Sequence, residues 1–96
     1  MVANTGEWTE ELVNESREWA ARDDCCGQYN LGLAYFYGLG GVARDYVQAY
    51  MWLTLCAKKY DVGIEVHLEI LKSKMTAEEI AEAQRNADAF VPILGV

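Results

Sequence analysis

The sequence has little positive charge, and this scarcity excludes two classes of partner. Its 96 residues contain 8 lysines and arginines against 15 aspartates and glutamates, a formal net charge of −7 at pH 7. Nucleic acids and anionic membranes attract basic surfaces, so we expect neither as a partner. No stretch approaches the roughly 20 apolar residues of a membrane-spanning helix, and the first residues, MVANTGEW, do not read as a secretory signal. The sequence therefore predicts a cytoplasmic location.

Proline and histidine each occur once, and cysteine occurs three times. Because the single proline, Pro92, lies near the C-terminus, no interior segment is prevented from forming a helix. A closed zinc site needs roughly four ligands at paired spacings, and one histidine, His67, without any Cys-x-x-Cys pair does not supply them. We therefore predict no metal site and no other cofactor. The odd number of cysteines, without a secretory signal, favours reduced thiols.

Apolar periodicity predicts five helices and no convincing strand. The expected helices cover residues 8–22, 25–37, about 46–60, 64–74 and about 77–91. Thr9, Asp45 and Thr76 are placed as N-caps, and Glu79 stands at the spacing that forms a capping box with Thr76. A chain of this length predicts a single domain, and short connections make sequential helices antiparallel neighbours.

Residue spacing also defines the inward faces of the first and last helices. In the first helix, the stripe comprises Trp8, Leu12, Ser16 and Trp19. In the last helix, it comprises Ile80, Ala83, Ala87 and Val91, and Pro92 is expected to end the helix. Because positions three or four residues apart share one face of a helix, we expect both stripes to face the core.

Three glycines, Gly38, Gly40 and Gly41, raise the question of a phosphate-binding loop. A P-loop needs the pattern G-x-x-x-x-G-K-[ST] after a strand, and a dinucleotide-binding turn needs G-x-G-x-x-G after a strand. The segment GLGGVARD has neither pattern, and a helix is expected before it. We therefore interpret Gly38 as the left-handed end of that helix and the other glycines as a chain reversal.

The residues on both sides of these glycines carry a further pattern. They read QYNLGLAY over 28–35 and GLGGVARDYVQAYMW over 38–52. This pattern resembles a Sel-1-like repeat, a relative of the tetratricopeptide repeats, in which a loop joins two antiparallel helices. The matching positions are Leu31, Gly32, Tyr35, Gly38, Gly40, Val42, Asp45, Ala49 and Trp52. The match is specific over residues 27–57.

The resemblance implies an all-α fold, a short right-handed α-solenoid of antiparallel helix pairs with about five helices. Within one helical repeat domain over residues 1–96, residues 8–22 would form a half unit, 25–60 a full repeat and 64–91 a divergent capping unit. Terminal helices of such arrays need a polar outer face for solubility, and the acidic first and last helices fit that role.

The resemblance also implies protein–protein interaction rather than catalysis. If Leu31, Gly32 and Tyr35 pack inward, other side chains of the same helix point toward a groove or a neighbouring helix. These candidate partner-binding residues are Tyr29, Asn30, Leu33, Phe36 and Tyr37. Rigid aromatic side chains beside an amide are favourable anchors for a peptide. The sequence thus predicts a non-enzymatic adaptor for a protein or peptide partner, unless neighbouring helices cover these aromatics.

Two other functions remain open on the sequence. The apolar segment at residues 90–96 and the exposed ends of a short solenoid would be buried in a homodimer. A thiol-dependent enzyme or ligand-binding protein would need a reactive group, and Cys56 with His67 is the best candidate pair. Because Cys56 lies on the inward stripe of its helix, where cysteine behaves as a small hydrophobic residue, we predict no catalytic residue.

The cysteines also allow a disulfide. Antiparallel packing of helices 25–37 and 46–60 would place Cys26 and Cys56 near the same end of the pair, and some secreted members of the Sel-1-like family brace their helices in a similar way. Cys26 and Cys56 are therefore the pair in which we expect any bridge to form. Reduced thiols are the other interpretation.

Overall fold

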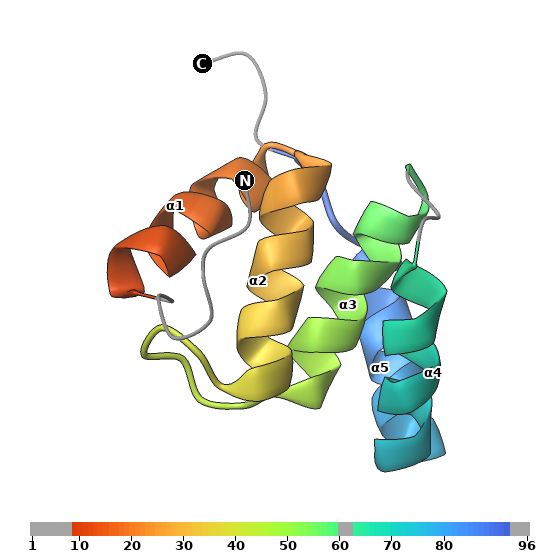
Figure 1. The fold of residues 1–96 in the computed structure, drawn as a ribbon. Helices are drawn as coiled ribbons and strands as arrows, with labels where there is room; N and C mark the ends of the chain where they lie inside the picture. Colours follow the sequence, from red (N-terminus) through yellow and green to blue (C-terminus); the bar gives the residue numbers. More distant parts are fainter. Residues whose placement is uncertain (1–8, 60–62, 93–96) are drawn as a thin grey trace.

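The computed structural model describes residues 9–59 and 63–92, and all regular structure in these ranges is helical (Figure 1). The helices are α1 (Glu10–Ala21), α2 (Cys25–Tyr37), α3 (Tyr46–Ala57), α4 (Ile64–Lys74) and α5 (Ala77–Asp88). The prediction of an all-α fold with five helices is confirmed. The predicted stripe residue Trp8 and most of the apolar segment 90–96 lie outside the described residues.

Side-chain caps explain where four of the helices begin. The Thr9 hydroxyl accepts a hydrogen bond at 3.1 Å from a backbone N–H in the first turn of α1. Asp24 caps α2 and Asp45 caps α3 in the same way. At α5, Thr76 and Glu79 form the predicted capping box. The predicted N-caps are confirmed, and each contributes about 1 kcal/mol because it pairs an N–H that the helix leaves free.

The last helix ends earlier than the sequence predicts. α5 ends at Asp88, so Pro92 lies well beyond the helix and does not stop it. Ala83 and Ala87 of the predicted inward stripe are buried, but Val91 is 79% exposed. The placement of Val91 on the inward stripe is therefore wrong, because the helical spacing on which it depends has ended before that residue.

α3 is the central helix of the molecule. It packs against α2, α4 and α5, while α1 packs against α2 on the side away from α4 and α5 (Figure 1). α4 and α5 contact α3 more closely than they contact each other. The buried residues of α3 are Ala49, Tyr50, Met51, Leu53, Leu55 and Cys56. Burial around most of a helix, rather than along one stripe, is typical of a helix that has neighbours on several sides.

The glycine-rich loop between α2 and α3 folds back onto α1. Gly38 ends α2 in the left-handed conformation, with φ of 69°, as predicted. Gly40 also has a positive φ, 62°, and a Cβ atom there would overlap the side chain of Val13. At the end of the loop, the N–H of Asp45 donates to a carbonyl oxygen of α2 at 2.9 Å. Chain reversal and close packing therefore account for these glycines.

A close approach at Gly27 sets the orientation of α1. A Cβ atom at Gly27 would lie 2.7 Å from the backbone nitrogen of Ala20 and 2.8 Å from the carbonyl oxygen of Ser16. α1 therefore faces α2 with small residues, and Val13, Ser16 and Ala20 are its buried positions. Cβ of Trp19 takes part in this contact, 2.7 Å from the position of a Gly27 Cβ atom, but the side chain is 53% exposed. The predicted inward stripe is thus correct at Ser16 and wrong at Trp19.

Candidate functional site

The five predicted partner-binding residues are not equally accessible. Phe36 is 7% exposed and belongs to the core, so it cannot take the direct binding role predicted for it. Asn30 lines a groove between α1 and α2. Tyr29 and Leu33 are half-buried, and Tyr37, which follows Asn30 by two turns of α2, is exposed. Neighbouring helices therefore cover part of the predicted aromatic stripe and leave part of it accessible.

His67 links the aromatic side chains of α2 to α4. Its ring centroid lies 5.9 Å from that of Tyr29 and 6.2 Å from that of Phe36, and both contacts are edge-to-face. The imidazole is half-buried, and its Nδ1 atom has no hydrogen-bond partner among the described residues. The histidine thus packs between two helices, which is the usual role of a lone histidine beside aromatic rings.

Exposed apolar side chains flank this histidine. Tyr37 stacks on Phe36 with 4.6 Å between ring centroids, and 57% of Tyr37 is exposed. On α4, Val66 and Ile70 are 61% and 40% exposed. Ile70 follows His67 by one turn, so the two share a side of α4. We name Tyr29, Leu33, Tyr37, Val66, His67 and Ile70 the α2–α4 face.

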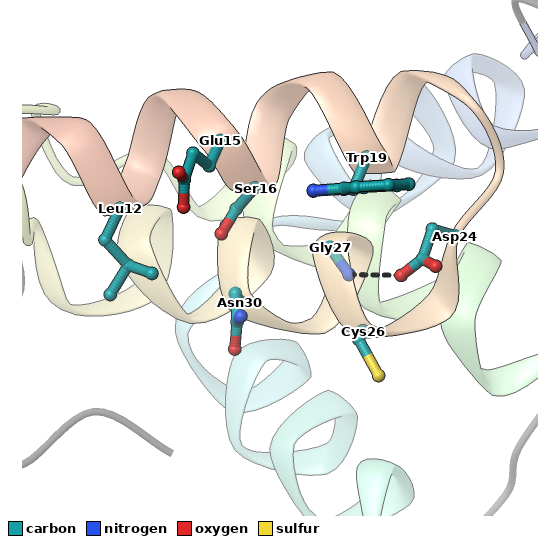
Figure 2. A pocket seen from close by; sticks show the side chains of 8 residues that line it. All are labelled: Leu12, Glu15, Ser16, Trp19, Asp24, Cys26, Gly27 and Asn30. Atoms are coloured by element: carbon teal, nitrogen blue, oxygen red, sulfur yellow. Dashed lines mark hydrogen bonds between the residues drawn. The ribbon is translucent and has the colours of Figure 1, made fainter. Parts of the chain in front are cut away.

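A second candidate surface is a hollow between α1 and α2 (Figure 2). It has a volume of about 290 Å³ and opens to solvent. Its lining residues are Leu12, Glu15, Ser16 and Trp19 of α1, Asp24 before α2, and Cys26, Gly27 and Asn30 of α2. We name it the α1–α2 groove. The orientation of α1 on α2 creates this groove, because Leu12 and Trp19 border the gap instead of filling it.

The polar side chains of the groove differ in whether they are already paired. Asp24 accepts a hydrogen bond from the Gly27 N–H at 2.9 Å (Figure 2). Ser16 is 3% exposed, yet its hydroxyl points into the groove and has no hydrogen-bond partner among the described residues. The amide of Asn30 is half-buried and likewise unpaired within residues 9–59 and 63–92. Two polar groups are therefore available to a ligand.

The sequence prediction did not find this groove. It placed Leu12 and Trp19 on the inward stripe, where they would have filled the space that the structure leaves open. Of the lining residues, it proposed Asn30 for binding. A usable signal was present in the pairing of Gly27 with the small residues Ser16 and Ala20, since small residues permit two helix backbones to approach closely.

The disulfide joins Cys25, rather than Cys26, to Cys56. The Cα atoms of Cys25 and Cys56 are 4.8 Å apart, and the bond links the start of α2 to the end of α3. Cys26 is an exposed free thiol. The predicted Cys26–Cys56 bridge and the alternative of three reduced thiols are therefore both wrong. A helix turns by about 100° per residue, so Cys25 faces α3 while Cys26 faces the α1–α2 groove.

The thiol–imidazole pair and the metal site considered from the sequence can be compared with the structure. Cys56 is held in the disulfide, so it is not a thiol that His67 could activate. In the described part of the chain, no three histidine, cysteine, aspartate or glutamate side chains are grouped so that they could hold a metal ion. None of the helices described above is both long and apolar enough to cross a membrane.

Asp23 has a shifted pKa and lies outside both candidate surfaces. The hydrogen bond from the Lys59 ammonium holds the pKa of its carboxyl group below the ordinary value of 3.8. The same carboxylate accepts a hydrogen bond from the side chain of Gln28 at 3.1 Å. These contacts join the α1–α2 connection to the end of α3, so we interpret the shift as part of a structural ion pair.

Comparison with known proteins does not assign the chain to a family. No protein-family model, curated protein or solved structure matches it. Function is therefore inferred from the two surfaces and from the resemblance seen in the sequence.

Proposed function

We propose that the chain is a non-enzymatic protein–protein interaction module that binds a protein or peptide partner through the α2–α4 face. The observation that carries this proposal is the exposure of Tyr37, Val66 and Ile70 around the edge-to-face contacts of His67. Exposed apolar side chains that gather on one surface mark interaction sites more often than isolated ones do. Aromatic anchors that are already held by packing also lose little freedom when a partner binds.

The proposed architecture is a short right-handed α-solenoid of the Sel-1-like, tetratricopeptide-like type. The motif positions behave as such a helix pair requires: Leu31 and Ala49 are buried, and Gly32 permits close contact with α3. A Cβ atom at Gly32 would lie 2.8 Å from Cγ of Leu53. The proposed units are a half unit at 8–22, a full repeat at 25–60 and a divergent capping unit at 64–91.

This architecture gives the α2–α4 face a place in the repeat. α2 and α4 would be the first helices of successive units, and the first helices of a solenoid line one continuous side. The contact of His67 with Tyr29 and Phe36 supports this arrangement, because it places α4 beside α2. A partner segment lying across the two helices would contact Tyr37 and Ile70 together.

Peptide selection tests this proposal. Peptides from a random phage-displayed library are enriched on the immobilised protein, synthesised, and measured by isothermal titration calorimetry. Tyr37→Ser and Ile70→Ser should each weaken the Kd at least about tenfold, because a central apolar anchor contributes about 1–3 kcal/mol to binding. Val91→Ser is the matched control, since it removes an exposed apolar side chain outside the face. Wild-type affinity in both face variants, or no enriched peptide, would refute the assignment.

A further inference from the structure

We infer that the α1–α2 groove is a second binding site, which takes an extended peptide segment carrying a lysine or arginine two residues from an aliphatic side chain. The inference rests on the proposed role of the chain as an interaction module, but it concerns a different surface and specifies the chemistry of the ligand. Three features of the groove support it: unpaired polar groups, negative charge along one edge, and apolar ends.

The unpaired polar groups favour a peptide backbone as the ligand. Ser16 is 3% exposed, and its hydroxyl, which has no hydrogen-bond partner among the described residues, opens onto the groove and can pair with a ligand there. Asn30 lies on α2 opposite Ser16 in Figure 2, with its side chain directed away from α1, and its amide offers both donors and an acceptor. An extended chain presents free N–H and C=O groups, whereas a helix pairs its own. The groove therefore suits an extended segment better than a helix.

Charge along α1 favours a basic segment. Glu15 lines the groove, and Glu11 and Glu18 lie one turn before and after it on the same side of the helix. All three are exposed. Arg22 is nearby, but its guanidinium lies over the ring of Trp19, 5.7 Å from the ring centroid. The formal net charge of −7 adds long-range attraction for a basic ligand.

The size and the apolar ends of the groove indicate which side chain of the peptide accompanies the basic one. Leu12 and Trp19 lie at opposite ends of the view in Figure 2, with Glu15 and Ser16 between them. A volume of about 290 Å³ is at the small end for a ligand site, so a short segment fits better than a folded element. Because Leu12 and Glu15 are neighbours on α1, an aliphatic side chain and a basic one two residues away, which lie on the same side of an extended chain, can contact both.

A second copy of this chain is the rival occupant of the groove. Two copies that each carry a net charge of −7 repel one another at low ionic strength. A basic segment from a different protein complements the groove, whereas the acidic surface of a second copy opposes it.

Matched variants in the same peptide selection test the inference. Glu15→Lys reverses the groove charge, and Glu82→Lys makes the same change at an exposed position of α5. Asn30→Ala removes the amide, and Asn86→Ala is its exposed counterpart in α5. Circular dichroism melts of all four variants show that each is folded before binding is compared.

Two results are expected: a characteristic composition of the enriched peptides and a pattern of affinities among the variants. Enriched peptides should carry lysine or arginine two residues from leucine, isoleucine or valine. Glu15→Lys should weaken their Kd at least about fivefold, and Asn30→Ala about threefold to tenfold. Glu82→Lys and Asn86→Ala should leave the affinity within about twofold of wild type, since their positions lie outside the groove. Added salt should weaken wild-type binding more than binding by Glu15→Lys.

The outcomes separate this inference from the proposed function. Peptides that depend on Tyr37 and Ile70 but not on Glu15 and Asn30 would leave the proposed function standing and overturn the groove. Peptides that depend on Glu15 and Asn30 alone would support the groove and remove the assignment to the α2–α4 face. The inference is overturned if the selection enriches no peptide, if the enriched peptides lack lysine and arginine, or if all variants bind them equally. Sedimentation that shows two copies associating, with the association lost in Asn30→Ala, also overturns it.

Discussion

At the scale of single residues, Gly27 decides which side chains of α1 reach the core. Its missing side chain lets the backbones of α1 and α2 approach, and the contact is made by Ser16, Ala20 and Cβ of Trp19, so that the Trp19 ring has no room between the helices. Trp19 is consequently displaced to the border of the α1–α2 groove, where it is 53% exposed. Gly27 thus determines how a neighbouring helix packs, an effect that the helix propensity of glycine does not describe.

We predict that Gly27→Ala lowers the free energy of unfolding by about 1–3 kcal/mol, because overpacking a close contact has an effect of that size. The obstructing atoms at Gly27 include the backbone of Ala20 and Ser16, which cannot move aside by a rotamer change. Gly32→Ala is the comparison, since its two nearest obstructing atoms belong to the side chain of Leu53 and alanine favours a helix interior by about 1 kcal/mol.

Urea denaturation of the two variants measures both effects. Gly27→Ala should be the less stable variant of the pair. An unchanged or raised midpoint in Gly27→Ala would show that the α1–α2 contact is looser than described.

At the scale of elements, the α2–α3 pair is tied at both ends. At the loop end, the N–H of Asp45 donates to the carbonyl oxygen of Tyr35 at 2.9 Å. At the other end, the Cys25–Cys56 disulfide joins the start of α2 to the end of α3. Both candidate surfaces include residues of α2, so a fixed α2–α3 pair holds them in a constant relation. This is the property that a binding surface built from separate helices needs.

We predict one free thiol, that of Cys26, under denaturing and non-reducing conditions, and three after reduction. Reduction should lower the free energy of unfolding by about 3–4 kcal/mol, because the bridge closes a loop with a sequence separation of 31. Thiol titration, alkylation with peptide mapping, and urea denaturation with and without reductant provide the measurements. Cys26→Ser is the control and should have no free thiol at near wild-type stability. Three thiols in the unreduced protein would contradict the bridge.

At the scale of the whole molecule, compactness and charge act together. The principal extents are 34 × 33 × 24 Å, and the radius of gyration is 12.6 Å. A compact domain of this length is expected to have a radius of about 12.5 Å, so the five helices form a globule rather than an extended array. The excess of acidic residues keeps such globules apart in solution, since like charges repel.

We predict that the protein is monomeric at low ionic strength over a wide range of concentration. Its net charge of −7 opposes self-association. Sedimentation equilibrium at several concentrations measures the mass directly. A mass that rises with concentration under these conditions would contradict the prediction and favour the homodimer interpretation.

Most of the secondary structure was predictable because its causes are local. Thr9, Asp45 and the Thr76–Glu79 box act within one turn of the helices that they begin. Gly38 adopts its left-handed conformation at the position where the apolar periodicity of α2 ends. The sequence also predicted the aromatic stripe of α2. It did not predict which of these side chains are buried and which are accessible, because His67 of α4 covers part of the stripe.

The sequence by itself determined the number of helices, their starting points and the acidic character of the surface. Tertiary structure decided which face of each helix is used. It selected Cys25 over Cys26 for the disulfide and placed Trp19 at the edge of a groove. Neighbouring positions on a helix differ by about 100° in direction, so a small rotation changes which residue is buried. That rotation is set by contacts such as Gly27 against Ala20, which join residues of different helices.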